Sequence, residues 1–184
     1  YWRDCDGPTM SQSLEAFIRT IVAPSWPAER YRRGDKEALS PAAAAAWNGI
    51  FINPKDANCI QCHTPPHYRN YQFANTGIQF AFARPVRPGN DPDIGRQKET
   101  DRQQDRRAYK VPTLVAVELR RPYMHNGAIQ TLDGVVDHYR RGGVYNNETD
   151  RFLDPRIKPR AWTIEQQHQL KELLATGFVV ENYP

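Results

Sequence analysis

The sequence has no long apolar run, no strong excess of either charge and few cysteines, and these shortages exclude several classes of protein. None of its apolar stretches approaches the roughly 18 to 20 residues of a transmembrane helix, so no membrane span is expected. A net charge of +4 over 184 residues, without a basic stripe, argues against nucleic-acid binding. The 15 prolines and 11 glycines instead predict short helices joined by long irregular connections.

Two of the three cysteines lie in Cys59-Ile60-Gln61-Cys62-His63, the attachment motif of c-type haem. Two thiols three positions apart on one turn can add to the two vinyl groups of one porphyrin, and His63 can then bind the iron. A thioredoxin-like pair would follow a strand, and a zinc site would need a second Cys/His pair; neither context is visible. The motif therefore predicts one covalent haem c held by Cys59, Cys62 and His63. Because this attachment is made outside the cytoplasm, we expect a periplasmic or otherwise exported protein.

The third cysteine, Cys5, lies far from the motif and leaves the chain with an odd number of cysteines. In an exported protein an odd cysteine indicates either a disulfide to another chain or an unpaired thiol. Cys5 is thus a candidate for an interchain disulfide with a partner.

Helical periodicity or capping signals occur in four segments, which are residues 11–22, 40–51, 131–141 and 163–177. In the first, Leu14, Phe17, Ile18 and Ile21 form an apolar stripe that is predicted to pack on a core. Residues 67–110 show no sustained period and predict a long loop region. The expected fold is mainly α, with residues 1–12 as an extension and 13–184 as a single haem domain.

A haem held by His63 leaves one axial position of the iron for another ligand, and the residues offer three kinds. Met124 would be the thioether of an electron-transfer cytochrome, and Tyr139 would bind as a phenolate that favours ferric iron. A histidine ligand would come from the set His67, His125, His138 and His168. The residues alone rank Met124 first.

Several short pieces occur around the haem motif in a specific order: residues 16–22, AFIRTIV; 39–41, LSP; 75–77, NTG; 94–96, IGR; 109–114, YKVPTL; and 122–127, PYMHNG. In this order, over about residues 13–178, the chain resembles the C-terminal haem domain of the bacterial di-haem cytochrome c peroxidase and MauG family. The resemblance implies a class I cytochrome c-like fold. One departure is Val115, where the family usually has arginine.

The resemblance also implies site residues. The family's distal ligand lies seventeen residues after the proline of the Pro-Tyr-x-His-x-Gly turn, which is Tyr139 here, as in MauG-like members; Met124 becomes the alternative. His125 matches a histidine near the haem. It is a candidate to contact the haem or its ligands without binding the iron itself. The carbonyls of Arg120 and Pro122 match two ligands of an interdomain calcium. Family members carry a second, peroxide-reacting haem in an N-terminal half, so a second haem-bearing chain is an expected partner.

Two functions follow as hypotheses. In the first, this chain is part of a cytochrome c peroxidase or MauG-like oxidoreductase and stores and transfers electrons for peroxide-dependent oxidation at a second haem. In the second, it is a stand-alone mono-haem electron-transfer cytochrome that docks an acidic redox partner protein through arginines, namely Arg30, Arg32, Arg33, Arg140 and Arg141.

Overall fold

The computed structural model describes residues 7–21, 25–78, 93–143 and 151–180. Its α-helices are α1 (Gly7–Thr20), α2 (Pro27–Arg32), α3 (Pro41–Ala46), α4 (Gln97–Thr100), α5 (Leu132–Arg140) and α6 (Ile164–Thr176). A π-helical turn, η1 (Trp47–Phe51), continues α3, and three 3-10 turns are η2 (Cys59–Gln61), η4 (Gln103–Asp105) and η5 (Val117–Leu119). The chain is mainly α with short helices and long connections, as predicted.

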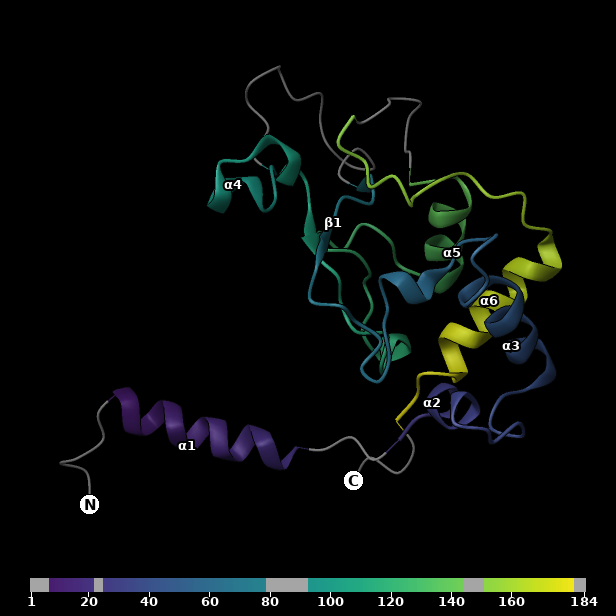
Figure 1. The fold of residues 1–184 in the computed structure, drawn as a ribbon, viewed down its shortest axis with the longest axis horizontal. Helices are drawn as coiled ribbons and strands as arrows, with labels where there is room; N and C mark the ends of the chain where they lie inside the picture. Colours follow the sequence, from purple (N-terminus) through teal and green to yellow (C-terminus); the bar gives the residue numbers. More distant parts are fainter. Residues whose placement is uncertain (1–6, 22–24, 79–92, 144–150, 181–184) are drawn as a thin grey trace.

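The core lies where α3, α5 and α6 pack together (Figure 1). The same core contains a cluster of buried aromatic rings from segments far apart in the sequence, namely Trp26, Trp47, Phe51, Tyr68 and Phe178. Some of these rings meet edge to face. Such pairs add to the stabilisation from apolar burial, because a ring edge is attracted to a neighbouring ring face. This cluster supports the segment that follows η2, which is where the haem motif ends.

The predicted starts of three helices are confirmed by the hydrogen bonds that cap them. The hydroxyl oxygens of Ser40 and Thr131 accept the backbone N–H groups three residues on, each at 3.1 Å. Thr163 and Gln166 form a complete capping box, with both reciprocal bonds present. These local signals place the starts of α3, α5 and α6 correctly.

The predicted loop region contains a short sheet that hydrophobic periodicity did not reveal. Strand β1 (Phe73–Ala74) pairs antiparallel with β2 (Tyr109–Lys110), so that Phe73 faces Lys110 and Ala74 faces Tyr109. Two-residue strands are too short to show alternation, and their partners lie more than thirty residues apart. The sheet brings residues 109–112 alongside the haem motif.

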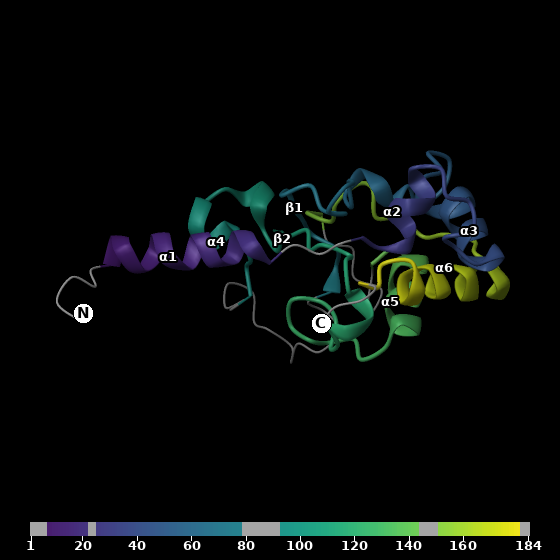
Figure 2. The ribbon, with the colours of Figure 1, turned by 90° about the horizontal axis from the view of Figure 1, so that it is seen from below.

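Helix α1 forms as predicted, but the prediction that its apolar stripe packs on a core of this chain is wrong for the described residues. None of its residues is buried, and Leu14, Phe17 and Ile18 are 59 to 63% exposed. Figure 1 shows α1 apart from the other helices, whereas in the view of Figure 2 it overlaps α4. The predicted boundary between residues 1–12 and 13–184 falls inside this helix and stays a prediction. Within the described ranges, no helix is long and apolar enough to cross a membrane.

Candidate haem site

The turn that carries the two motif cysteines is closed by its own backbone. The N–H of His63 donates to the carbonyl of Cys59 at 2.8 Å, and Asn58 begins the turn in the left-handed conformation, with φ of 49°. The N–H of Asn58 donates to the carbonyl of Ile50 at 3.1 Å, which ties the turn to η1. Both thiols are free, and burial raises the pKa of Cys59 to about 12, so that thiol is protonated. The turn thus presents two unpaired thiols and His63 together.

The ring of His63 is oriented by two carbonyl groups. Its Nδ1 lies 3.1 Å from the carbonyl oxygen of Tyr68 and 3.1 Å from that of Pro112. Because carbonyl oxygens only accept hydrogen bonds, Nδ1 must carry the proton, and the lone pair is on Nε2. Burial lowers the pKa of His63 to about 4, so the ring is neutral at neutral pH. A neutral imidazole with a bonded Nδ1–H is the form that binds a metal.

Tyr68 links the orientation of His63 to a buried carboxylate. Its side chain is fully buried, and its hydroxyl donates to Oε2 of Glu29 at 3.1 Å. Glu29 is 5% exposed and also accepts hydrogen bonds from the guanidinium groups of Arg32 and Arg33, at 2.7 to 2.9 Å. The carbonyl that orients His63 therefore belongs to a residue anchored at its far end by an ion-paired carboxylate.

The Glu29 cluster predicts a specific loss of stability in acid. The hydrogen bonds from Arg32 and Arg33 lower the pKa of Glu29 from 4.5 to about 2, against the opposing effect of burial. A lowered folded-state pKa means that the stabilisation is complete above pH 4.5 and is lost as the pH falls towards 2. Between pH 5 and pH 3 we expect the free energy of unfolding to fall by about 1 kcal/mol more than in Glu29→Gln, since the half-exposed arginines are screened. Urea unfolding of both haem-loaded proteins at several pH values measures this difference; parallel curves would contradict it.

Tyr139 lies on α5 and approaches the cysteines from another part of the chain. Its side chain is partly buried and packs against the core cluster that also contacts Cys59. Burial, together with the nearby thiols of Cys59 and Cys62, raises the pKa of Tyr139. The phenol therefore stays protonated unless a positive charge is placed beside it, and a ferric iron supplies such a charge. The prediction that Tyr139 faces inward is confirmed; its role as a ligand stays a prediction.

The end of α5 is held by two close backbone approaches. Gly77 and Gly143, both with positive φ, meet so closely that a Cβ on either would collide with the backbone of the other segment. At the last residue of α5, the carbonyl of Arg140 accepts a hydrogen bond from the N–H of Arg160 at 2.7 Å. Tyr139 thus lies on a helix turn fixed from two sides.

The other ligand candidates are placed differently. His67 and His168 are exposed, whereas His138 is buried and its Nε2 lies 2.9 Å from the carbonyl oxygen of Thr76. Because a carbonyl oxygen only accepts, Nε2 carries the proton and the lone pair is on the buried Nδ1, which has no hydrogen-bond partner among the described residues, so His138 stays a candidate. Met124 is partly buried against the core and stays the alternative to Tyr139.

The candidates in the Pro-Tyr-Met-His-Asn-Gly turn make contacts of their own. Nε2 of His125 lies 2.8 Å from Oδ2 of Asp93, and its ring stacks on Tyr109 with centroids 3.5 Å apart. The guanidinium of Arg120 donates to the carbonyls of Thr113 and Val115. The position of His125 beside the haem, and calcium binding by the carbonyls of Arg120 and Pro122, stay predictions. Cys5 lies outside the described residues.

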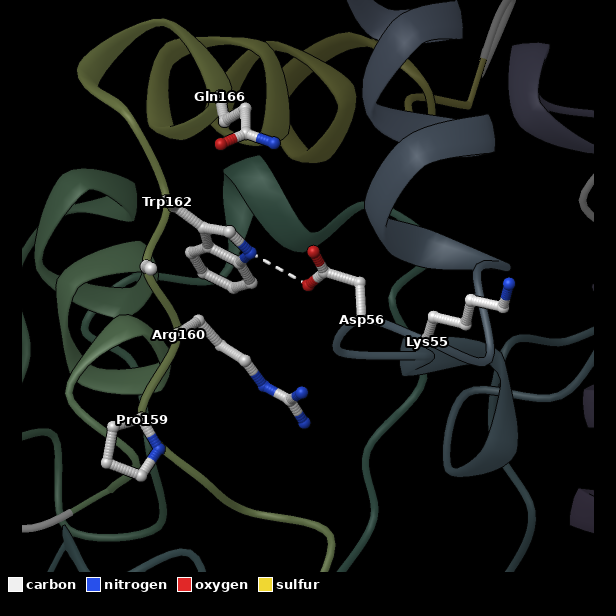
Figure 3. A pocket seen from close by; sticks show the side chains of 7 residues that line it. Lys55, Asp56, Pro159, Arg160, Trp162 and Gln166 are labelled. Atoms are coloured by element: carbon white, nitrogen blue, oxygen red, sulfur yellow. Dashed lines mark hydrogen bonds between the residues drawn. The ribbon is translucent and has the colours of Figure 1, made fainter.

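A cavity of about 270 Å³ opens beside the haem motif (Figure 3). In it, Nε1 of Trp162 donates to Oδ1 of Asp56 at 2.8 Å, and Asp56 also accepts the N–H of Ala57. This pair ties the segment before α6 to the loop before Cys59. Lys55 and Arg160 line the same cavity and form no ion pair within the described ranges, and the charges of Asp56 and Arg160 act on the Cys59 thiol in opposite directions.

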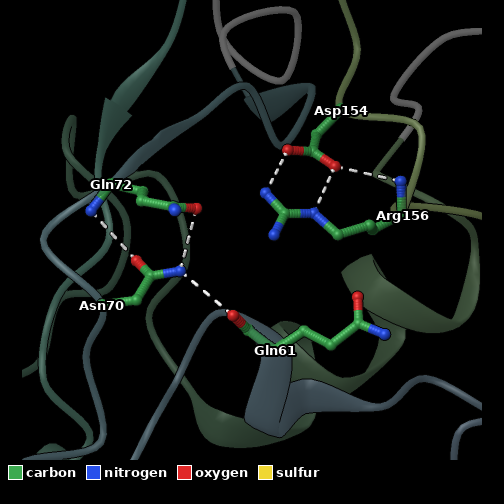
Figure 4. A network of polar contacts seen from close by, with 5 residues as sticks. All are labelled: Gln61, Asn70, Gln72, Asp154 and Arg156. Carbon is green, nitrogen blue, oxygen red and sulfur yellow. Dashed lines mark hydrogen bonds and ion pairs between the residues drawn. The ribbon is translucent and has the colours of Figure 1, made fainter.

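Figure 4 shows a network of polar groups that includes Gln61, the residue before Cys62. Asn70 donates to the carbonyl of Gln61 at 3.1 Å, and Arg156 forms a bidentate pair with Asp154 at 2.6 and 2.8 Å. The charges of Arg156 and Asp154 both act on the Cys62 thiol, whose pKa burial raises. The motif turn is therefore bordered by charged residues from the segment after α5.

The arginines expected to dock an acidic partner have acidic neighbours in their own chain. Arg32 and Arg33 pair with Glu29, Arg140 and Arg141 pair with Asp137, and Arg30 lies 3.6 Å from Asp35. These pairs neutralise much of the positive charge that docking would use. Five arginines face three carboxylates in these pairs, so part of the positive charge remains, and docking of an acidic partner by a stand-alone carrier stays a prediction.

Three residues that shape the site were not predicted, namely Glu29, Tyr68 and Trp162. Glu29 and Tyr68 contact each other across 39 residues of sequence, and Trp162 contacts Asp56 across 106. The backbone carbonyl of Tyr68 lies only five residues from His63 but leaves no trace in residue type. One local signal for the Glu29 cluster does exist in the sequence. Glu29 precedes Arg32 and Arg33 by three and four positions, the spacing at which side chains of a helix meet.

No family model matches the chain. Comparison with individual proteins does identify relatives. The chain is 29% identical over 144 residues to the methylamine utilization protein MauG of Methylophilus methylotrophus, covering 78% of this chain and 40% of that protein. It is 31% identical over 128 residues to the cytochrome c551 peroxidase of Nitrosomonas europaea, covering 70% and 36%. The chain thus spans less than half the length of these relatives.

The fold has a counterpart among solved structures. A MauG-like protein associated with microbial copper homeostasis superposes with a TM-score of 0.75 at 21% sequence identity, and the match covers 97% of this chain and 58% of that one. The fold and the sequence similarity agree, and both include the haem motif region. This chain belongs to the family of MauG and the bacterial cytochrome c peroxidases.

Proposed function

We propose that this chain is the electron-storing haem domain of a MauG-like or cytochrome c peroxidase-type oxidoreductase. Cys59 and Cys62 would form the two thioether bonds, His63 would be the proximal ligand and Tyr139 the distal one. A haem bound there supplies one-electron redox chemistry. The observation that carries the proposal is the orientation of His63, whose Nδ1–H is held by two carbonyls so that Nε2 is ready to bind a metal.

The residues of the site fit such a group. Two free thiols and a neutral imidazole share one turn, and the partly buried phenol of Tyr139, from a distant segment, lies near enough for both thiols to affect its pKa. Tyr139 would occupy the distal position as a phenolate and so keep small molecules such as peroxide from that face. This chain would then transfer electrons, while peroxide reacts at a second haem in a partner. We also infer an exported, periplasmic location, because thioether attachment takes place outside the cytoplasm.

The number of haems tests the proposal directly. The chain, produced with haem-attachment machinery, is expected to hold one haem and one iron that stay bound after denaturation, and Cys59→Ala with Cys62→Ala is expected to abolish this covalent attachment. Mass spectrometry and iron analysis measure both. The ferric protein should show a single low-spin EPR signal and react slowly with peroxide. A fast peroxide reaction of the isolated chain, or haem that dissociates on denaturation, would contradict the proposal.

A further inference from the structure

The apolar face of α1 is the most conspicuous exposed surface in the described residues. Met10, Leu14, Phe17, Ile18 and Ile21 are each 54 to 63% exposed. At about 100° per residue, the four that belong to α1 and Ile21, which directly follows the end of α1 at Thr20, lie within an arc of about 100° on one side of the helix. They make up five of the nine large apolar residues exposed in the described ranges, so the exposure is concentrated on this face. We call this set the α1 stripe.

The rest of α1 is polar and nearly uncharged. Arg19 pairs with Glu15 at 2.5 Å, and these are its only charged residues. A helix that lies on a membrane surface usually carries several lysines or arginines on its polar face, and α1 does not. A stripe about 100° wide is instead what a helix buries when it packs against a protein core.

The comparison structure offers a candidate to cover this stripe, namely the part of that protein that this chain does not match. Its match with this chain spans 97% of the 184 residues, which leaves about 6 residues outside, fewer than the 14 of α1. The aligned span therefore includes part of α1. The same match covers 58% of the other chain, so a large part of that protein has no counterpart here. An unmatched region of that size can form a domain with a core of its own.

We propose that the α1 stripe is the docking surface for the domain that makes up the unmatched part of the relatives. Phe17 and Ile18, the two most exposed residues of the stripe, lie at its centre along the helix and would be the main anchors. This inference rests on the proposed function, since it names the surface through which the electron-storing domain joins its partner. It does not depend on the identity of the haem ligands.

Photo-crosslinking in cells that naturally make the protein tests the surface. Phe17→p-benzoylphenylalanine places the reactive group on the stripe, and Gln12→p-benzoylphenylalanine places it on the opposite side of α1 as a matched control. We expect the probe at 17, and not that at 12, to link to a polypeptide region whose sequence aligns with the unmatched part of the relatives. Phe17→Ser with Ile18→Ser is expected to weaken retention of that region on size-exclusion chromatography at least tenfold, whereas Gln12→Ser leaves it unchanged.

The other outcomes overturn the proposal. A link to α1 of a second copy would make the stripe a homodimer contact, a link to lipid would make it a membrane contact, and a link to residues 25–180 would mean that the chain covers its own helix. Equal linking from both positions, or none, would also refute it. Haem and iron content are measured on the same preparations, so failure of the proposed function is seen separately from failure of the surface.

Discussion

Tyr139→Phe is expected to change the ferric haem-loaded protein from a low-spin form to a high-spin form with an open distal position. Removal of the hydroxyl takes away the oxygen that would bind iron but keeps the ring that packs against the core. Because a phenolate stabilises ferric over ferrous iron, its loss should raise the midpoint potential. A tenfold difference in phenolate affinity between the two oxidation states corresponds to about 59 mV for a one-electron couple. EPR and a potentiometric titration measure the two effects.

Met124→Leu is the matched control, since it tests the alternative ligand with little change in volume. We expect it to leave the spin state and the potential unchanged and to cost less than about 1.5 kcal/mol of stability. If Met124→Leu opens the distal position while Tyr139→Phe does not, methionine is the ligand and the assignment from the motif spacing is wrong.

Phe178→Ala is expected to have the largest effect on stability. Phe178 is fully buried and its ring lies 4.9 Å from that of Tyr68 and 5.7 Å from that of Phe51, between centroids. Truncation of a buried phenylalanine removes its transfer free energy and leaves a cavity, which together cost about 3 to 5 kcal/mol. Since Tyr68 supplies a carbonyl to His63, we also expect a broader and shifted ferric EPR signal at temperatures where the variant is folded.

Leu119→Ala controls for the loss of apolar surface as such. Leu119 is 82% exposed, so its truncation should change the free energy of unfolding by less than about 0.5 kcal/mol. Urea unfolding followed by circular dichroism compares the two variants. Similar losses in both would mean that the aromatic cluster is not the support of the site.

The features of this protein that depend on neighbouring residues could be predicted from its sequence alone. The haem motif occupies five consecutive positions, and the caps at Ser40, Thr131 and Thr163 act within three residues, so these features could be read directly. The inward position of Tyr139 follows from the helical period, since Leu132, Val136 and Tyr139 share one side of α5.

Tertiary structure decided which of these groups meet and what fixes them. The Nδ1–H of His63 bonds to carbonyls 5 and 49 residues away, and the hydroxyl of Tyr68 bonds to a carboxylate 39 residues away. Such contacts depend on the path of the backbone rather than on residue type. The α1 stripe also shows that periodicity alone does not decide which residues are buried. Helical period predicts that Leu14, Phe17 and Ile18 will be buried, but only the packed structure shows that the described part of this chain does not bury them, because burial needs a surface to pack against.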